Sequence, residues 1–125
     1  MVVANHQLVP YDRNGGDAPV NSDVRYPAGA NDMQLVREWI YDNIAADRFG
    51  RGSVDKVVLF GHSSGGAHIA MNLYGSPNKV FPPVAGVMYL SVPFWYDRTR
   101  PIRKKILQTY YGSDSEDVWG VSHPL

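Results

Sequence analysis

Two kinds of hydrophobic pattern alternate along this chain. Residues 56–60 (KVVLF) and 84–91 (VAGVMYLS) are nearly continuous apolar runs without polar alternation. Strands that are buried on both faces look like this, and such strands belong to parallel sheets. Residues 1–5 begin with a shorter apolar run of the same character. The pattern therefore predicts three strands.

Between these runs, apolar residues recur at helical spacing. The first such stretch has an N-cap candidate in Asn31, with Gln34 three residues later to complete a capping box. Gly50 and Gly52 are expected to end this helix. Its apolar stripe consists of Met33, Leu35, Val36, Trp39, Ile40 and Ile44.

Two further helices are expected later in the chain. One begins near Ser64 and stops at residues 75–77 (GSP), and the other begins near Pro101, a residue that suits a first helical turn. The resulting order, β-α-β-α-β-α, implies right-handed crossovers between parallel strands. The fold class predicted for residues 1–125 is α/β, with central parallel strands and helices on both faces, in a single domain.

Composition removes several function classes. Lys plus Arg and Asp plus Glu each number 12, so the net charge is zero and the chain lacks the attraction that a nucleic-acid binder relies on. The absence of cysteine excludes disulfides, thiolate metal sites and a cysteine nucleophile. The first residues do not form a signal peptide, and no run approaches the ~18 apolar residues of a membrane span. We therefore expect a cytoplasmic protein that neither crosses a membrane nor binds nucleic acid.

One hexapeptide carries chemistry. Residues 61–66 (GHSSGG) follow the second expected strand and open the second expected helix, which is the setting of the G-x-S-x-G nucleophile elbow. Gly61 and Gly65 would remove Cβ atoms that collide across so tight a turn. Ser63 would then present its hydroxyl as a nucleophile, and the backbone N–H of Ser64 would form part of an oxyanion hole.

Rival interpretations of the hexapeptide are weaker. A P-loop requires Lys after its last glycine, where this chain has Ala67, and a dinucleotide fingerprint requires glycine where it has Ser63. An ordinary glycine-rich turn remains the alternative. The histidines show no spacing typical of a metal site, so we expect no metal and no cofactor. His62 is expected to pack under the turn, and His68 to pack or hydrogen-bond within the fold.

Residues 61–68 (GHSSGGAH) resemble the nucleophile elbow of the α/β-hydrolase superfamily. The similarity is to the esterase branch that includes hormone-sensitive-lipase-like and arylformamidase-like enzymes. Two departures are the His6-Gln7 pair, where that branch usually has Tyr-Arg, and a longer loop at residues 11–25. Other blocks agree in order: residues 8–10 (LVP), 26–28 (YPA), Asp32, Trp39, 49–50 (FG), 110–112 (YYG) and 122–125 (SHPL).

The resemblance implies a partial α/β-hydrolase domain, truncated at both ends, because that branch places an oxyanion loop upstream and its catalytic Asp and His downstream. The implied function of the full-length protein is hydrolysis of carboxylic esters by Ser63 through an acyl-enzyme. The alternatives are an arylformamidase-like amide hydrolase and a non-catalytic fragment or binding module that retains the elbow. The implied partner is a small ester or activated amide, and exposed sheet edges predict poor solubility or self-association.

The chain itself offers an acid and a histidine after Ser63. Asp97 and His123 satisfy the order Ser, acid, His that is typical of this fold. Order alone does not establish distance, however. The alternative is that Asp97 pairs with Arg98 or Arg100 in a loop. Phe94, with the two aromatic residues that follow it, is expected to line an acyl pocket or to pack within the fold.

Overall fold

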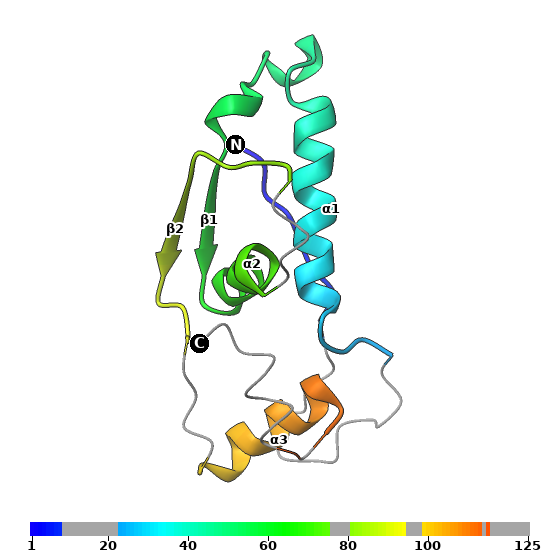
Figure 1. Cartoon of the computed structure of the whole chain (residues 1–125), viewed down its shortest axis with the longest axis vertical. Coiled ribbons are helices and arrows are strands. Elements are labelled where there is room, and N and C mark those ends of the chain that lie inside the picture. The colour runs from blue at the N-terminus through cyan, green and yellow to red at the C-terminus, as the bar shows by residue number, and fades with distance from the viewer. Residues whose placement is uncertain (9–22, 76–80, 95–98, 114, 116–125) are drawn as a thin grey trace.

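The computed structural model describes residues 1–8, 23–75, 81–94, 99–113 and 115 of the chain. Three α-helices, two strands and two short 3₁₀ turns make up this part (Figure 1). None of the described helices is long and apolar enough to cross a membrane. The elements in chain order are α1 (Ala28–Asn43), 3₁₀ turns at Asp47–Phe49 and Val54–Lys56, β1 (Val58–His62), α2 (Ser64–Tyr74), β2 (Gly86–Leu90) and α3 (Pro101–Tyr111).

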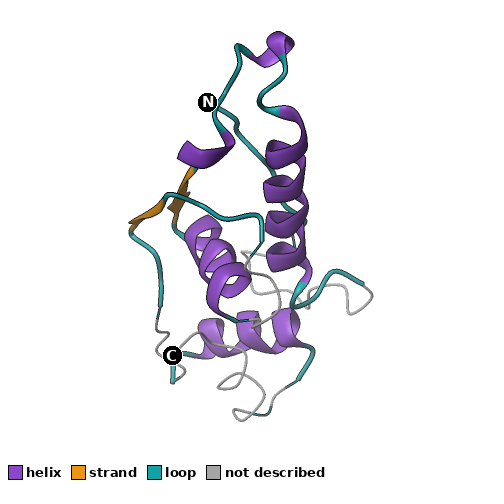
Figure 2. Cartoon of the chain, turned by 45° about the horizontal axis from the view of Figure 1, so that its top comes forward, coloured by secondary structure: helices purple, strands orange, loops and turns teal. Residues whose placement is uncertain are grey.

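The two strands form a parallel pair. Val58 lies opposite Gly86 at one end of the ladder, and His62 lies opposite Leu90 at the other. Helix α2 connects them, so this part of the chain is a β-α-β crossover (Figure 2). The predicted α/β class with parallel strands is thereby confirmed, although β1 begins and ends two residues later than the apolar run 56–60 suggested.

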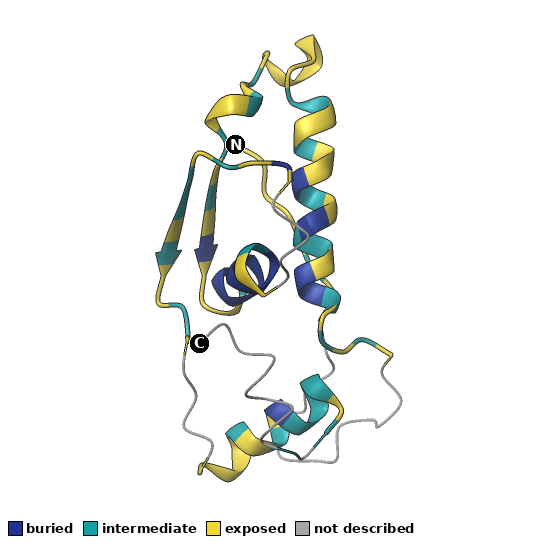
Figure 3. Ribbon diagram, in the orientation of Figure 1, coloured by how far each residue is buried: buried dark blue, intermediate teal, exposed yellow. Residues whose placement is uncertain are grey.

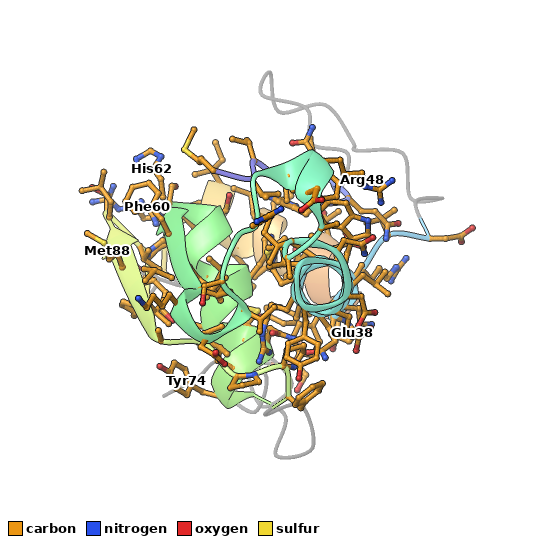
Figure 4. All side chains as sticks on the ribbon, turned by 90° about the horizontal axis from the view of Figure 1, so that it is seen from above. Glu38, Arg48, Phe60, His62, Tyr74 and Met88 are labelled. Atoms are coloured by element: carbon orange, nitrogen blue, oxygen red, sulfur yellow. The ribbon has the colours of Figure 1, made fainter. Side chains whose placement is uncertain are left out.

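Helix α2 packs against β1, and α1 packs against α2 on the side away from the sheet (Figures 1 and 4). Helices on both faces were expected, but in the described residues this packing covers one face only. The side chains of the other face remain exposed (Figure 3). Self-association through the sheet stays a prediction. The exposed apolar residues of this open face are Val58, Phe60, Met88 and Leu90.

The strand predicted at residues 1–5 is not formed, so this prediction was wrong. A strand requires a neighbouring backbone to pair its N–H and C=O groups, and the described sheet contains only β1 and β2. Residues 1–5 are instead exposed. The segment is tied to α1, because the backbone N–H of Gln7 donates to the Asp32 carboxylate at 2.7 Å and its side-chain amide donates at 3.1 Å.

Helix α1 begins at Ala28, three residues before the expected cap at Asn31. The capping box was therefore wrong. Gln34 lies inside the helix and is buried. Its side-chain amide donates to the Phe81 carbonyl, outside the helix, and so does not cap the first turn. The helix also ends at Asn43, before either glycine. Gly50, at a φ of 74°, closes the short turn Asp47–Phe49 instead.

The other two helices begin where the sequence predicts. Helix α2 starts at Ser64 and ends before Gly75, and α3 starts with Pro101 in its first turn. Proline suits this position because the N–H it lacks would have no partner within the helix. The predicted start of the helix that follows the G-x-S-x-G turn is therefore confirmed.

A buried polar network joins α1, α2 and the chain leading into β2. The Arg37 guanidinium donates to Asn72 Oδ1 at 2.7 Å, to Gln34 Oε1 at 3.2 Å and to the Pro82 carbonyl. Asn72 in turn donates to Gln34 Oε1 at 3.1 Å, and the Gln34 amide donates to the Phe81 carbonyl at 2.9 Å. Burial lowers the pKa of Arg37. The Glu38 carboxylate accepts from the Gln34 amide at 2.7 Å and raises the pKa of Arg37, but burial has the larger effect. The acceptors that contact the guanidinium itself are neutral amide and carbonyl oxygens, so the loss of one of them is expected to destabilise the buried cation.

Replacing Asn72 with alanine is expected to lower the free energy of unfolding by about 2–3 kcal/mol, because it removes an acceptor from the buried Arg37 guanidinium. Urea denaturation followed by circular dichroism measures this loss. Asn43→Ala is the matched control, since the Asn43 amide donates to the Trp39 carbonyl in an exposed setting; it should change stability by less than about 0.5 kcal/mol. Equal losses in the two variants would contradict a special role for the network.

Candidate functional site

Ser63 occupies the single residue between β1 and α2. Its backbone has a φ of 51° and a ψ of −127°, a conformation that residues with a Cβ rarely adopt. Hydrogen bonds hold it on both sides: its N–H donates to the Leu90 carbonyl at 3.0 Å, and its carbonyl accepts from Gly66 at 3.1 Å and Ala67 at 3.3 Å. The side chain is exposed. The fold therefore fixes a strained, accessible serine at the carboxyl edge of the sheet.

The sharp turn depends on a close approach between strand and helix. A Cβ added at Gly61 would collide with Gly66 Cα and lie 2.7 Å from its nitrogen. A Cβ added at Gly66 would collide with Val92 and lie 3.1 Å from the Gly61 carbonyl oxygen. By contrast, a Cβ at Gly65 would meet no atom of the described residues within 4 Å. The prediction that the turn requires glycine at position 61 is confirmed. The same prediction for Gly65 was wrong, because the close contact is made by Gly66.

Ser64 is the first residue of α2. The first N–H groups of a helix have no acceptor within it, and the helix dipole places partial positive charge at this end. An N–H in this position can stabilise an oxyanion that forms beside Ser63. That role of Ser64 stays a prediction.

His62 lies on the open face of the sheet. Its side chain is exposed and, like that of Phe60, points away from α2 (Figure 4). The expectation that it packs under the turn was wrong, because alternate residues of a strand face opposite sides. Gly61 takes the inner position next to α2, and His62 consequently takes the outer one.

His68 packs inside the fold, as expected. It is 9% exposed and its ring contacts that of His6, with 4.4 Å between the ring centroids. Tyr110 on α3 places its hydroxyl 3.4 Å from His68 Nδ1. Burial, with a smaller contribution from His6, lowers the pKa of His68 to about 4. His68 is therefore neutral at pH 7.

The next strand presents a second strained serine. Ser91 follows β2 directly, one residue beyond the pair His62 and Leu90, and has a φ of 50°. Sequence reasoning missed it, because no glycine flanks Ser91 and its neighbours form no recognisable motif. Phe94 packs its ring on Tyr89 with centroids 5.3 Å apart, but the residue remains exposed. Its role in an acyl pocket or in packing stays a prediction.

Several predicted residues fall outside the part of the chain that the structure describes. Asp97 and His123 are among them, as are the two aromatic residues after Phe94. The predicted pairing of Asp97 with His123 stays a prediction. Within the described ranges, no three His, Asp or Glu side chains are grouped so that they could hold a metal ion.

The chain is similar in sequence to fungal lipases. It is 40% identical over 79 residues to Lipase 1 and 39% identical over 79 residues to Lipase 2, both of Geotrichum candidum. Each match covers 62% of this chain but 13% of the lipase. A secreted lipase of Arthroderma benhamiae is 44% identical over 55 residues, which is 42% of this chain and 9% of that lipase.

No protein-family model and no solved structure matches the chain. The lipase similarity and the parallel β-α-β arrangement together support an esterase or lipase relationship over part of the chain. The expectation of a cytoplasmic protein is contradicted, because the Arthroderma relative is named as secreted. The expectation rested on the composition of the first residues, which does not determine where the complete protein is located.

Gly61→Ala and Gly65→Ala form a matched pair that tests the close approach at the turn. We expect Gly61→Ala to cost about 3 kcal/mol or to prevent folding, because backbone atoms of Gly66 cannot move aside. Gly65→Ala should be neutral or stabilise by up to about 1 kcal/mol, because it lies in α2 and no described residue would crowd the added Cβ. Thermal unfolding measures both, and a larger loss for Gly65→Ala would contradict the geometry.

Proposed function

We propose that this chain supplies the nucleophile segment of a serine hydrolase that acts on carboxylic esters. The observation that carries the proposal is the backbone of Ser63, which is strained, exposed and placed between a parallel strand and the start of a helix. Strained residues of this kind concentrate at active sites, and this setting is that of a nucleophile elbow. The lipase relatives support the same chemistry independently of the geometry.

In the proposed reaction, Ser63 Oγ attacks the acyl carbon of the ester while a histidine accepts its proton. The Ser64 N–H stabilises the negative oxygen of the tetrahedral intermediate. The intermediate collapses, the alcohol leaves with the proton that the histidine returns, and the acyl group remains on Ser63. A water molecule, deprotonated by the same histidine, then releases the carboxylic acid and restores the serine.

The described residues do not place a histidine on Ser63. His62 points to the open face of the sheet, and His68 is engaged with His6 and Tyr110. His123 with Asp97 satisfies the chain order, but the resemblance places the catalytic acid and histidine downstream of these residues. The chain spans 13% of the length of the Geotrichum lipases that it matches. The identity of the acid and the base in the complete enzyme is therefore a proposal as well.

Esters are favoured over amides as substrates, because the relatives are named lipases. The narrower assignment to the hormone-sensitive-lipase-like or arylformamidase-like branch rests on the resemblance of residues 61–68 (GHSSGGAH) and of the shorter blocks that agree with that branch in order. A non-catalytic module that retains the turn is the competing interpretation. The name of the Arthroderma relative also supports secretion of the complete enzyme.

The 125-residue chain is expected to hydrolyse a short-chain aryl ester no faster than its Ser63→Ala variant. The turn is local, but no base contacts Ser63 within the described residues, and a serine without a positioned base loses orders of magnitude in rate. Release of nitrophenol and labelling by a fluorophosphonate probe measure this. Labelling that both Ser63→Ala and His123→Ala abolish would show a working site within these residues.

The role of Ser63 as nucleophile is tested in a longer protein that contains these 125 residues together with a catalytic acid and a histidine. Fluorophosphonate labelling and ester hydrolysis are expected there, and Ser63→Ala should reduce both by at least about 10³-fold. Ser64→Ala is the matched control, because it removes a neighbouring hydroxyl but keeps the backbone N–H. Labelling that survives Ser63→Ala would refute the proposed nucleophile, and an inactive long product would favour the non-catalytic module.

A further inference from the structure

Two side chains of α1 and α2 hold the N-terminal segment, residues 1–8, against the helices. The Asp32 carboxylate on α1 accepts two hydrogen bonds from Gln7, through the backbone N–H and through the side-chain amide. One residue earlier, the His6 ring meets that of His68 on α2 at an interplanar angle of 62°. Residues 1–5 are themselves exposed. These contacts attach residues 6 and 7 to the two helices.

The attachment site is poorly suited to positive charge on His68. Its ring is packed beneath α1, where a Cβ at Gly29 would lie 2.5 Å from His68 Nδ1. The titratable groups that face it are His6 from the N-terminal segment, Asp32 from α1 and Tyr110 from α3. Of these, His6 opposes a charge on His68 and Asp32 favours it, but burial has the largest effect.

We propose that the contact between His6 and His68, together with the Asp32 bonds to Gln7, forms an acid-sensitive latch that releases residues 1–8 from the two helices. A proton on His68 in the closed latch is buried beside a second imidazole. Release removes His6 and the cover that residues 1–8 give to the His68 ring, and it frees the Asp32 carboxylate from Gln7 to balance the new charge. The released form therefore accepts the proton more readily than the closed form.

The direction of the pH effect follows from proton linkage. In the closed form, burial and His6 lower the pKa of His68 from 6.5 to about 4. Release removes His6 and part of the burial, so the released form has the higher pKa and binds more protons between the two values, with 6.5 as its upper limit. Closure is fully favoured above pH 6.5, and its advantage declines as the pH falls towards 4. Each pH unit in the interval increases the release equilibrium by at most about tenfold, and the total increase is at most about 10²-fold.

The absence of cysteine permits a direct measurement of release. Nitroxide labels attached to Ala4→Cys and Asp42→Cys, both exposed positions, report the distance between the N-terminal segment and α1 by pulsed electron spin resonance. We expect a single narrow distance at pH 7 and a broad, longer distribution at pH 4.5. Circular dichroism at the same pH values should show that the helices persist.

Three histidine variants decide the outcome. His68→Gln should abolish the pH dependence of the distance, and His6→Gln should reduce it, which keeps the test decisive if the buried variant does not fold. His62→Gln is the matched control and should behave like the parent, because His62 lies exposed on the open face of the sheet. A distance that does not change with pH, an equal response in His6→Gln and His62→Gln, or loss of the helices together with release would overturn the latch.

Discussion

The approach of Gly61 to Gly66 is the constraint on which the rest of this structure depends. It lets α2 leave the end of β1 after a single intervening residue, and that residue must consequently take the strained conformation seen at Ser63. The bond from Ser63 N–H to the Leu90 carbonyl then links the turn to β2. The position of the serine is therefore set by backbone geometry and not by contacts of its own side chain.

The second determinant is polar and lies on the far side of α2. Arg37 and Gln34 of α1 meet Asn72 of α2 and the carbonyls of Phe81 and Pro82, so the same network fixes α1 and the entry to β2. An apolar interface could tolerate sliding of one helix past another. Directed hydrogen bonds to a buried cation do not, and they define how α1 lies on α2.

The sequence predicts the parts of the fold that local chemistry determines. The G-x-S-x-G turn, the start of α2 and the proline that opens α3 are recognisable because each needs a particular residue at one position. The helix start near Asn31 and the strand at residues 1–5 were wrong, because both depend on distant partners. The Gln34 side chain hydrogen-bonds to Phe81 and Asn72 instead of capping the helix. An apolar run forms a strand only where a neighbouring strand pairs with it. The strain at Ser91 left no local signature at all.

In the described part of the chain nothing lies within 4 Å of a Cβ placed at Gly65, and this has a consequence for how such turns are recognised. The familiar five-residue pattern requires glycine at this position, yet the backbone contact constrains the residue that follows it. A search that insists on the fifth letter would discard chains with alanine or serine there, although their turns could close in the same way. In this chain the close approach requires a glycine five positions after Gly61, at Gly66, and not four positions after it, at Gly65. Pattern definitions derived from contacts would thus retain divergent members that letter-by-letter definitions lose.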